Sequence, residues 1–245
     1  MSTSVATGIR AGLEAQRKTT PRAADRVMIS GFETAAGQAI AEALARRGAR
    51  LVLQAHTSDD AVAMAAGRLA AKARSVSLLN TCGASRADAI ADAQTAIATL
   101  GGADAVIVVV PFDHDALRGV VAARDGEQAL GDMLARPIET IRIAANRMRV
   151  TWTAGTVVAV LVLPEGLSSR EELVARLLKS QMAGVVRGEA DRLADDGIVV
   201  VAVSATRSDE PNSGCIPELA ELVAELAGGP ADRLSGVVYE AVLSA

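Results

Sequence analysis

The stretch Val27-Met-Ile-Ser-Gly-Phe-Glu-Thr-Ala-Ala-Gly37 decides the fold. A short apolar run, Val27–Ser30, ends at a glycine, and a second glycine follows six residues later. Residues 37–47 then carry apolar side chains at helical spacing and end before Gly48. A buried strand that passes through a glycine turn into a helix is the opening unit of an α/β sheet.

The alternation of strand and helix continues along the chain. We expect further strands at 51–53, 76–79, 105–110, 156–163, 198–203 and 237–242, and further helices at 59–72, 85–100, 127–148, 168–194 and 217–226. The continuous apolar run at 105–110 is typical of a strand buried on both faces. The sequence therefore predicts an α/β fold with a single Rossmann-type, doubly wound parallel sheet of seven strands.

Length and composition limit the class of protein. The chain has 245 residues, 50% hydrophobic and 2% aromatic, so it can bury one large aliphatic core. A net charge of −4 argues against a nucleic-acid partner, and no apolar run reaches the roughly 18–20 residues of a membrane span. Cys82 and Cys215 stand far apart and outside metal-ligand spacing, which indicates a reducing, cytoplasmic location and no metal site.

Residues 1–26 differ from the rest and are interpreted as an N-terminal arm, with residues 27–245 as the domain. The arm is rich in arginine and has no strong apolar period, so we expect it to order only against a neighbouring surface. A transit peptide, which is also rich in arginine and in serine or threonine, is the alternative.

The order of elements and three short segments resemble the short-chain dehydrogenase/reductase family over nearly all of residues 27–243. The segments are the turn Ser30–Gly37, Leu193-Ala-Asp-Asp-Gly-Ile198 and Gly236-Val-Val. The resemblance implies a nicotinamide dinucleotide at the strand ends. It also implies a proton relay in which a lysine lowers the pKa of a tyrosine, a serine orients the carbonyl and an asparagine holds a water.

Most catalytic positions implied by the resemblance carry other residues. Registering the family motif places the lysine on Lys179, the tyrosine on Ala175, the serine near Val162 and the asparagine near Ala135. Three of the four positions therefore lack the functional group. Because a lone lysine on a long helix is usually solvated, we expect no catalytic role for Lys179 and no catalytic set.

The cofactor turn is also altered. Gly31 and Gly37 remain, but the middle glycine falls on Ala35, and Glu33 places a carboxylate in the turn, where it would repel phosphate. The acidic residue expected at the end of the second strand falls on Ala55. We therefore expect the turn to be structural only and no cofactor to bind.

Two further segments depart from the family. The asparagine-rich segment after the fourth strand reads Val108-Val-Val-Pro111. The segment 204–215 runs directly into the next expected helix and is too short to cover a substrate as a lid.

The framework for assembly is retained. In the family, two long helices pack against a partner subunit of a tetramer. The helix at 168–194 carries a long apolar set: Leu173, Leu177, Leu178, Met182, Val185, Val186 and Leu193. Apolar residues on the preceding helix are Ile138, Ile141 and Ala145. Part of this set would be exposed in a monomer, so we expect aspartate at Leu178 or Met182 to disrupt assembly.

The two histidines lack the neighbours of a metal site. His56 and His114 have no cysteine or second histidine beside them. Asp113, His114 and Asp115 follow the fourth strand at the carboxyl edge of the sheet, where such folds bind ligands. A solvated loop is the simpler interpretation of these three residues.

Three functions remain open. The leading hypothesis is a catalytically inactive subunit that supports an active, NAD-dependent paralogue of hydroxyacyl-CoA dehydrogenase type in a hetero-oligomer. This resembles the inactive subunit of the heterotetrameric dehydrogenase of anaerobic toluene breakdown. The alternatives are a homo-oligomeric ligand-binding or regulatory protein that uses the vacated groove, and an oxidoreductase with relocated catalytic residues such as Asp113, His114 and Lys179.

Overall fold

The computed structural model describes residues 24–81, 85–151, 153–207, 215–229 and 235–241. Its elements are β1 (Arg26–Ser30), α2 (Ala35–Arg46), β2 (Arg50–Ala55), α3 (Asp60–Ala70), β3 (Ser75–Asn80), α4 (Arg86–Thr99), β4 (Ala105–Pro111), α5 (His114–Ala122), α6 (Gly126–Val150), β5 (Gly155–Pro164), α7 (Ser169–Arg192), a 3₁₀ turn (Ala194–Asp196), β6 (Ile198–Arg207), α8 (Cys215–Ala227) and β7 (Val238–Ala241).

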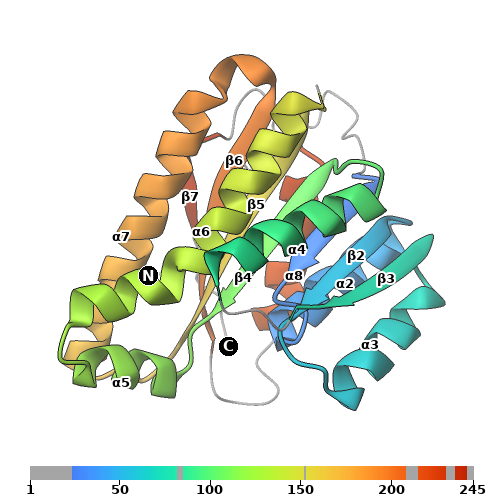
Figure 1. Cartoon of the computed structure of the whole chain (residues 1–245). Helices are drawn as coiled ribbons and strands as arrows, with labels where there is room; N and C mark the ends of the chain where they lie inside the picture. The colour runs from blue at the N-terminus through green and yellow to red at the C-terminus, as the bar shows by residue number, and fades with distance from the viewer. Residues whose placement is uncertain (1–23, 82–84, 152, 208–214, 230–234, 242–245) are drawn as a thin grey trace, which may run out of the picture.

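The strands form one parallel sheet of seven strands in the order β3-β2-β1-β4-β5-β6-β7. The chain builds outward from β1 to β3, then returns to the other side of β1 and builds outward again to β7 (Figure 1). This is the predicted doubly wound Rossmann-type sheet, and the prediction of the fold class is confirmed.

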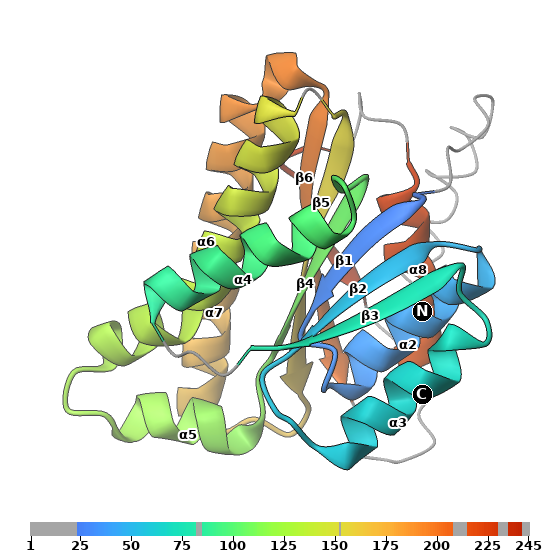
Figure 2. The same ribbon diagram turned by 45° about the vertical axis from the view of Figure 1, so that its right-hand side comes forward.

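The sheet separates two helical layers. Alternate strand residues point to opposite faces, so Ile29 packs with the layer of α2, α3 and α8, and Met28 packs with the layer of α4, α5, α6 and α7. Figure 2 shows the two layers on either side of the twisted sheet. Both core clusters are mainly aliphatic, as the low aromatic content predicts.

The segment after β4 is a helix, and the expected solvated loop at 113–115 is wrong. The Asp113 carboxylate accepts the Ala116 N–H at 2.7 Å and so caps the first turn of α5. Leu117 and Val120, one turn apart, are buried against the core. The cap and the burial of these two residues against the core stabilise this short helix.

The ends of the domain lie close to their expected places. Arg26, which was assigned to the arm, opens β1 and pairs with Asp104 at 2.7 Å. The arm itself, through residue 23, lies outside the described residues, as does Cys82. β6 continues to Arg207, and residues 208–214 of the expected short connection also lie outside the described part. No described helix is both long and apolar enough to cross a membrane.

The first testable consequence concerns Gly37. A Cβ on Gly37 would lie 2.3 Å from the Gly31 carbonyl oxygen, whereas a Cβ on Gly67 in α3 would meet nothing within 4 Å. We expect Gly37→Ala to lower the free energy of unfolding by about 1–3 kcal/mol because backbone must shift. Gly67→Ala is the matched control and should raise it by up to about 1 kcal/mol, the helix-propensity gain. Urea denaturation measures both, and equal stability of the two variants would contradict the close-contact argument.

Candidate functional site

The candidate site is the carboxyl edge of the sheet beside β1. β1 lies between β2 and β4, and the direction of strand addition reverses there. In open α/β sheets, ligands bind outside the carboxyl ends of the strands at such a switch point. The turn that leaves β1 and the segments that follow β2 and β4 therefore form the walls of the site.

The turn after β1 is held by close backbone contacts. Gly31 has φ +85°, and a Cβ there would lie 2.5 Å from the Val109 carbonyl oxygen of β4. The Thr34 hydroxyl donates to the Gly31 carbonyl at 2.8 Å and accepts the Gly37 N–H at 2.9 Å. Thr34 is thus the N-cap of α2, whose first residue, Ala35, is exposed at the edge. The turn aims the positive end of α2 at the site.

Glu33 does not point where the sequence suggested. Its carboxylate accepts the backbone N–H of His56 at 3.3 Å. His56 directly follows the last residue of β2, so the carboxylate is held at the end of β2 and not over the first turn of α2. The expected repulsion of a phosphate at α2 is therefore not imposed by the fold.

The His56 ring lies against Thr81, which directly follows β3. Thr81 donates its hydroxyl to the Ala55 carbonyl at 3.2 Å, so its oxygen can accept from His56 Nδ1 at 2.7 Å. Burial of the ring lowers the pKa of His56, although the Glu33 carboxylate acts in the opposite direction. His56 is therefore neutral at pH 7.

Two buried polar side-chain atoms on strands of the sheet make no hydrogen bond within the described part of the chain: Gln54 Nε2 and Ser204 Oγ. Gln54 is next to last on β2, and Ser204 lies in the carboxyl half of β6. An unsatisfied buried polar atom costs about 1–3 kcal/mol. An unsatisfied buried atom in a folded protein calls for an explanation, and a functional role is one of them. The two atoms therefore support a ligand site at this edge.

The positions registered on the family's catalytic residues do not come together. Val162 packs in the α2–α3–α8 layer and Ala175 packs in the opposite layer. Ala135 is exposed on α6. Tyr239, the only tyrosine of the chain, packs against the layer opposite Ala175. Lys179 pairs with Glu240 of β7 at 3.6 Å.

A second polar cluster joins α5 to α7, and no sequence motif predicted it. Glu171 Oε1 lies 3.7 Å from His114 Nδ1 and 3.3 Å from Arg118 Nε. The Glu171 side chain is only 7% exposed, and that of His114 is 27% exposed. Asp113, by contrast, is engaged as the cap of α5. Lys179 is eight residues beyond Glu171, about 12 Å along the helix axis.

Glu171 owes its position to a capping box. Its carboxylate accepts the Ser168 N–H at 2.8 Å, while the Ser168 hydroxyl accepts the Glu171 N–H at 3.4 Å. The bonds to Ser168, followed by the charges of Arg118 and His114, lower the pKa of Glu171. The ionised carboxylate is thus available to orient His114. The pattern Ser168-x-x-Glu171 was visible in the sequence as a cap, but only the fold brings α5 to it.

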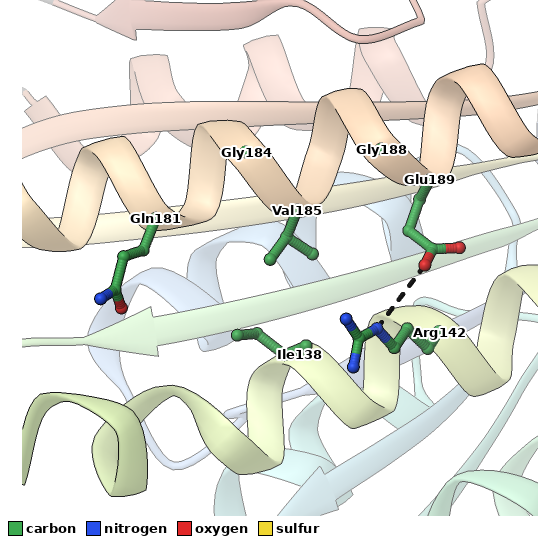
Figure 3. Close-up of a pocket in the computed structure, with 7 residues that line it drawn as sticks. All are labelled: Ile138, Arg142, Gln181, Gly184, Val185, Gly188 and Glu189. Carbon is green, nitrogen blue, oxygen red and sulfur yellow. Dashed lines mark ion pairs between the residues drawn. The ribbon is translucent and has the colours of Figure 1, made fainter. Parts of the chain in front are cut away.

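A groove of about 430 Å³ lies apart from this edge, between α6 and α7 (Figure 3). Val185 and Gln181 point from α7 toward Ile138 of α6, and Arg142 Nε lies 3.6 Å from Glu189 Oε1. Gly184 and Gly188 also line the groove.

The apolar set expected on α7 divides between the core and the surface, and the two residues chosen for mutation lie in the core. Leu178 and Met182 are 0% and 1% exposed, and Ile141 and Ala145 are buried as well. Leu173 and Leu177 are instead 53% and 46% exposed. Aspartate at Leu178 or Met182 would therefore disrupt the core of this chain before it could report on assembly.

Solved structures share the fold at low sequence identity. A variant of a Serratia marcescens short-chain dehydrogenase/reductase is 20% identical, with a TM-score of 0.72 and coverage of 92% of this chain and 100% of that one. The 3-oxoacyl-(acyl-carrier protein) reductase from Brucella melitensis in complex with NAD is 18% identical, with a TM-score of 0.71 and coverage of 90% and 96%. An NADH-dependent reductase complexed with NAD is 17% identical, with a TM-score of 0.70 and coverage of 88% and 94%.

No family model matches the sequence. The search of curated proteins also found no match. The chain therefore has the fold of short-chain dehydrogenase/reductases, at identities that establish the fold alone.

These neighbours correct two expectations. The solved structures are oxidoreductases, which are enzymes, so the expectation of a chain that is no enzyme on its own was wrong. Two of the neighbours hold NAD, so the expectation of no cofactor was wrong as well. The physical reason lies in the register: Val162 and Ala175 face opposite layers and are not a displaced catalytic pair. The turn likewise keeps its backbone geometry without the middle glycine.

The residues at the edge fit a dinucleotide. The first turn of α2 offers backbone N–H groups and a positive dipole end to a pyrophosphate. Glu33 offers a carboxylate to hydroxyl groups at the end of β2. Among the described residues no group of three or more His, Cys, Asp and Glu side chains could hold a metal ion.

The lowered pKa of Glu171 predicts a dependence of stability on pH. The ionised carboxylate stabilises the fold above the ordinary glutamate pKa of about 4.3, and this contribution disappears as the pH falls through the lower pKa of the folded state. Glu171→Gln should therefore be less stable than wild type at pH 7, and the difference should shrink as the pH falls below the ordinary glutamate pKa. Denaturant titrations at several pH values measure the difference. Glu172→Gln, on the exposed side of the same turn, is the control, and a difference that does not change with pH would contradict the prediction.

Proposed function

We propose that the chain is a nicotinamide-dinucleotide-dependent oxidoreductase with relocated acid/base groups. Support comes from the fold it shares with oxidoreductases and from the polar groups at the carboxyl edge of its sheet. The turn at Gly31 and the first turn of α2 would hold the pyrophosphate. A bound nicotinamide supplies or accepts a hydride at a carbon that bears a hydroxyl or carbonyl group.

Hydride transfer to or from such a carbon needs a proton donor or acceptor at the oxygen. His114 is the candidate, because it is the first residue of α5, which follows β4 at the carboxyl edge, and its Nδ1 lies 3.7 Å from Glu171 Oε1. This pair is the observation that carries the proposal. A buried carboxylate that orients an imidazole is a recurrent arrangement for general acid/base catalysis. The other ring nitrogen, Nε2, would exchange the proton with the substrate oxygen.

Glu171 is a positioning residue in this proposal and not a proton donor. Its hydrogen bond from the Ser168 N–H at 2.8 Å and the neighbouring charge of Arg118 favour the ionised form. Asp113 is assigned only the cap of α5, and Lys179 only its pair with Glu240.

His114→Gln should lower kcat/KM about 100-fold or more, the usual range for loss of a general acid/base. Glu171→Gln should lower kcat/KM by a smaller factor than His114→Gln does. The pH dependence of its kcat/KM should differ from that of wild type. The assay follows NADH or NADPH absorbance with a panel of hydroxy and oxo compounds that includes oxoacyl thioesters.

Asp115→Asn is the matched control, because its side chain is 93% exposed one residue from His114. It should stay within about twofold of wild type. Dinucleotide binding should be unchanged in all three variants. A His114→Gln variant that keeps wild-type turnover would refute the assignment, and a wild-type chain without turnover or dinucleotide binding would refute the oxidoreductase.

We further propose that the chain assembles with a catalytically active short-chain dehydrogenase paralogue into a tetramer. The arrangement would resemble the heterotetrameric hydroxyacyl-CoA dehydrogenase of anaerobic toluene breakdown. The surface that supports this proposal is a stripe on α7, at spacings of three or four residues, made of Leu173, Leu177, Gln181, Gly184 and Gly188. The leucines at one end of the stripe provide apolar area for an interface. The glycines at the other end, beside the groove, have no side chains and allow a helix of the partner to approach α7 closely.

Leu173→Asp combined with Leu177→Asp should abolish co-elution with the paralogue, because a charge would be buried in the interface. Met64→Asp is the matched control, since Met64 is 61% exposed on α3, in the opposite helical layer. Size-exclusion chromatography with light scattering after co-expression measures the assembly. Co-elution of the double variant, or separate elution of the wild-type chains, would contradict the proposed interface.

A further inference from the structure

We infer that Glu33 recognises the adenosine ribose of the cofactor and makes the chain selective for NAD(H) over NADP(H). The inference rests on the proposed use of a nicotinamide dinucleotide. In dinucleotide-binding sheets, a carboxylate at the end of the second strand binds the ribose hydroxyls. In this chain that strand, β2, ends at Ala55, which has no polar side chain.

Glu33 supplies the missing carboxylate from the neighbouring turn. Its Oε2 accepts the His56 backbone N–H at 3.3 Å, which holds the carboxylate at the end of β2. The second oxygen, Oε1, takes part in no hydrogen bond or ion pair with the described residues. The side chain is half-buried, so Oε1 can face a ligand. A carboxylate held at one oxygen and open at the other can accept from the hydroxyls of a ribose.

The same carboxylate would oppose a 2′-phosphate. NADP(H) would bring a group with nearly two negative charges against Glu33. Among the described residues, the hydrogen bonds of the turn include no cationic side chain. Arg136 is a cation whose charge acts on His56, and it pairs with Asp92 at 2.6 Å. His56 itself is kept neutral, because burial lowers its pKa. The local charges thus favour the cofactor with free hydroxyls.

A purely structural role for Glu33 is the competing explanation. The hydrogen bond to His56 could serve only to cap the end of β2. Loss of such a cap would destabilise the edge and weaken the binding of NADH and NADPH alike. Loss of ribose recognition would instead change the ratio of the NADH and NADPH affinities. The ratio is therefore the quantity to measure.

The experiment titrates NADH and NADPH into the full-length protein and follows cofactor fluorescence. Wild type should bind NADH at least tenfold more tightly than NADPH, a difference of about 1.4 kcal/mol. Glu33→Gln should weaken the binding of NADH about tenfold and leave the binding of NADPH unchanged or tighter. The affinities for NADH and NADPH should then agree within about threefold. Glu33→Asp, which keeps the charge, should continue to exclude NADPH and serves if the glutamine variant does not fold.

Asp195→Asn is the matched control, because it removes one exposed negative charge beside the opposite end of the sheet, ahead of β6. Its selectivity should equal that of wild type. If wild type binds both cofactors and Glu33→Gln keeps the wild-type ratio, or Glu33→Asp admits NADPH, the inference about Glu33 fails alone. If wild type binds neither cofactor, the proposed function fails together with the inference.

Discussion

The close approach of two glycines holds the site in shape. Gly37 on α2 packs so tightly on the Gly31 carbonyl that a Cβ would lie 2.3 Å from that oxygen. Gly31 in turn abuts the Val109 carbonyl of β4, where a Cβ would lie 2.5 Å away. These contacts fix the exit angle of the chain from β1, the direction of α2 and therefore the place of Glu33. Backbone packing alone requires glycine at both positions.

Much of the fold could be predicted from the sequence because the signals were local. The β-branched run at 105–110 is typical of a buried strand, and the glycine turn after Ser30 is typical of a passage from strand to helix. α5 was missed because only Leu117 and Val120 are buried on it, too few for a visible period. Its ordering depends on the cap from Asp113 and on packing against α7, and the second of these is a tertiary contact.

The site was less predictable because its geometry is made by side chains from separate elements. The register of the family motif placed Val162 and Ala175 in one catalytic set. Because side chains alternate along a strand, Val162 packs in the helical layer on the other side of the sheet from Ala175. A shift of one residue brings Leu161 or Leu163 to the face of α7, and neither has a hydroxyl. Glu33 was assigned to the wrong neighbour for a similar reason: sequence adjacency places it near α2, whereas its hydrogen bond takes it to the end of β2.

The polar groups of the site were visible in the sequence, but as helix caps. A parallel sheet with crossover helices brings the N-termini of its helices to the carboxyl edge of the strands. Thr34, Asp113 and Ser168 each cap such a helix there. The cap residues satisfy backbone N–H groups. Their sequence neighbours Glu33 and His114, and Glu171 one turn on, lie at the same edge of the sheet, Glu33 at the end of β2 and the other two between α5 and α7. The division of charge follows from this arrangement. The first turn of α2 favours an anion, whereas Glu33 and Glu171 favour hydroxyl groups and an imidazole, so one edge can distinguish the phosphates of a ligand from its hydroxyls.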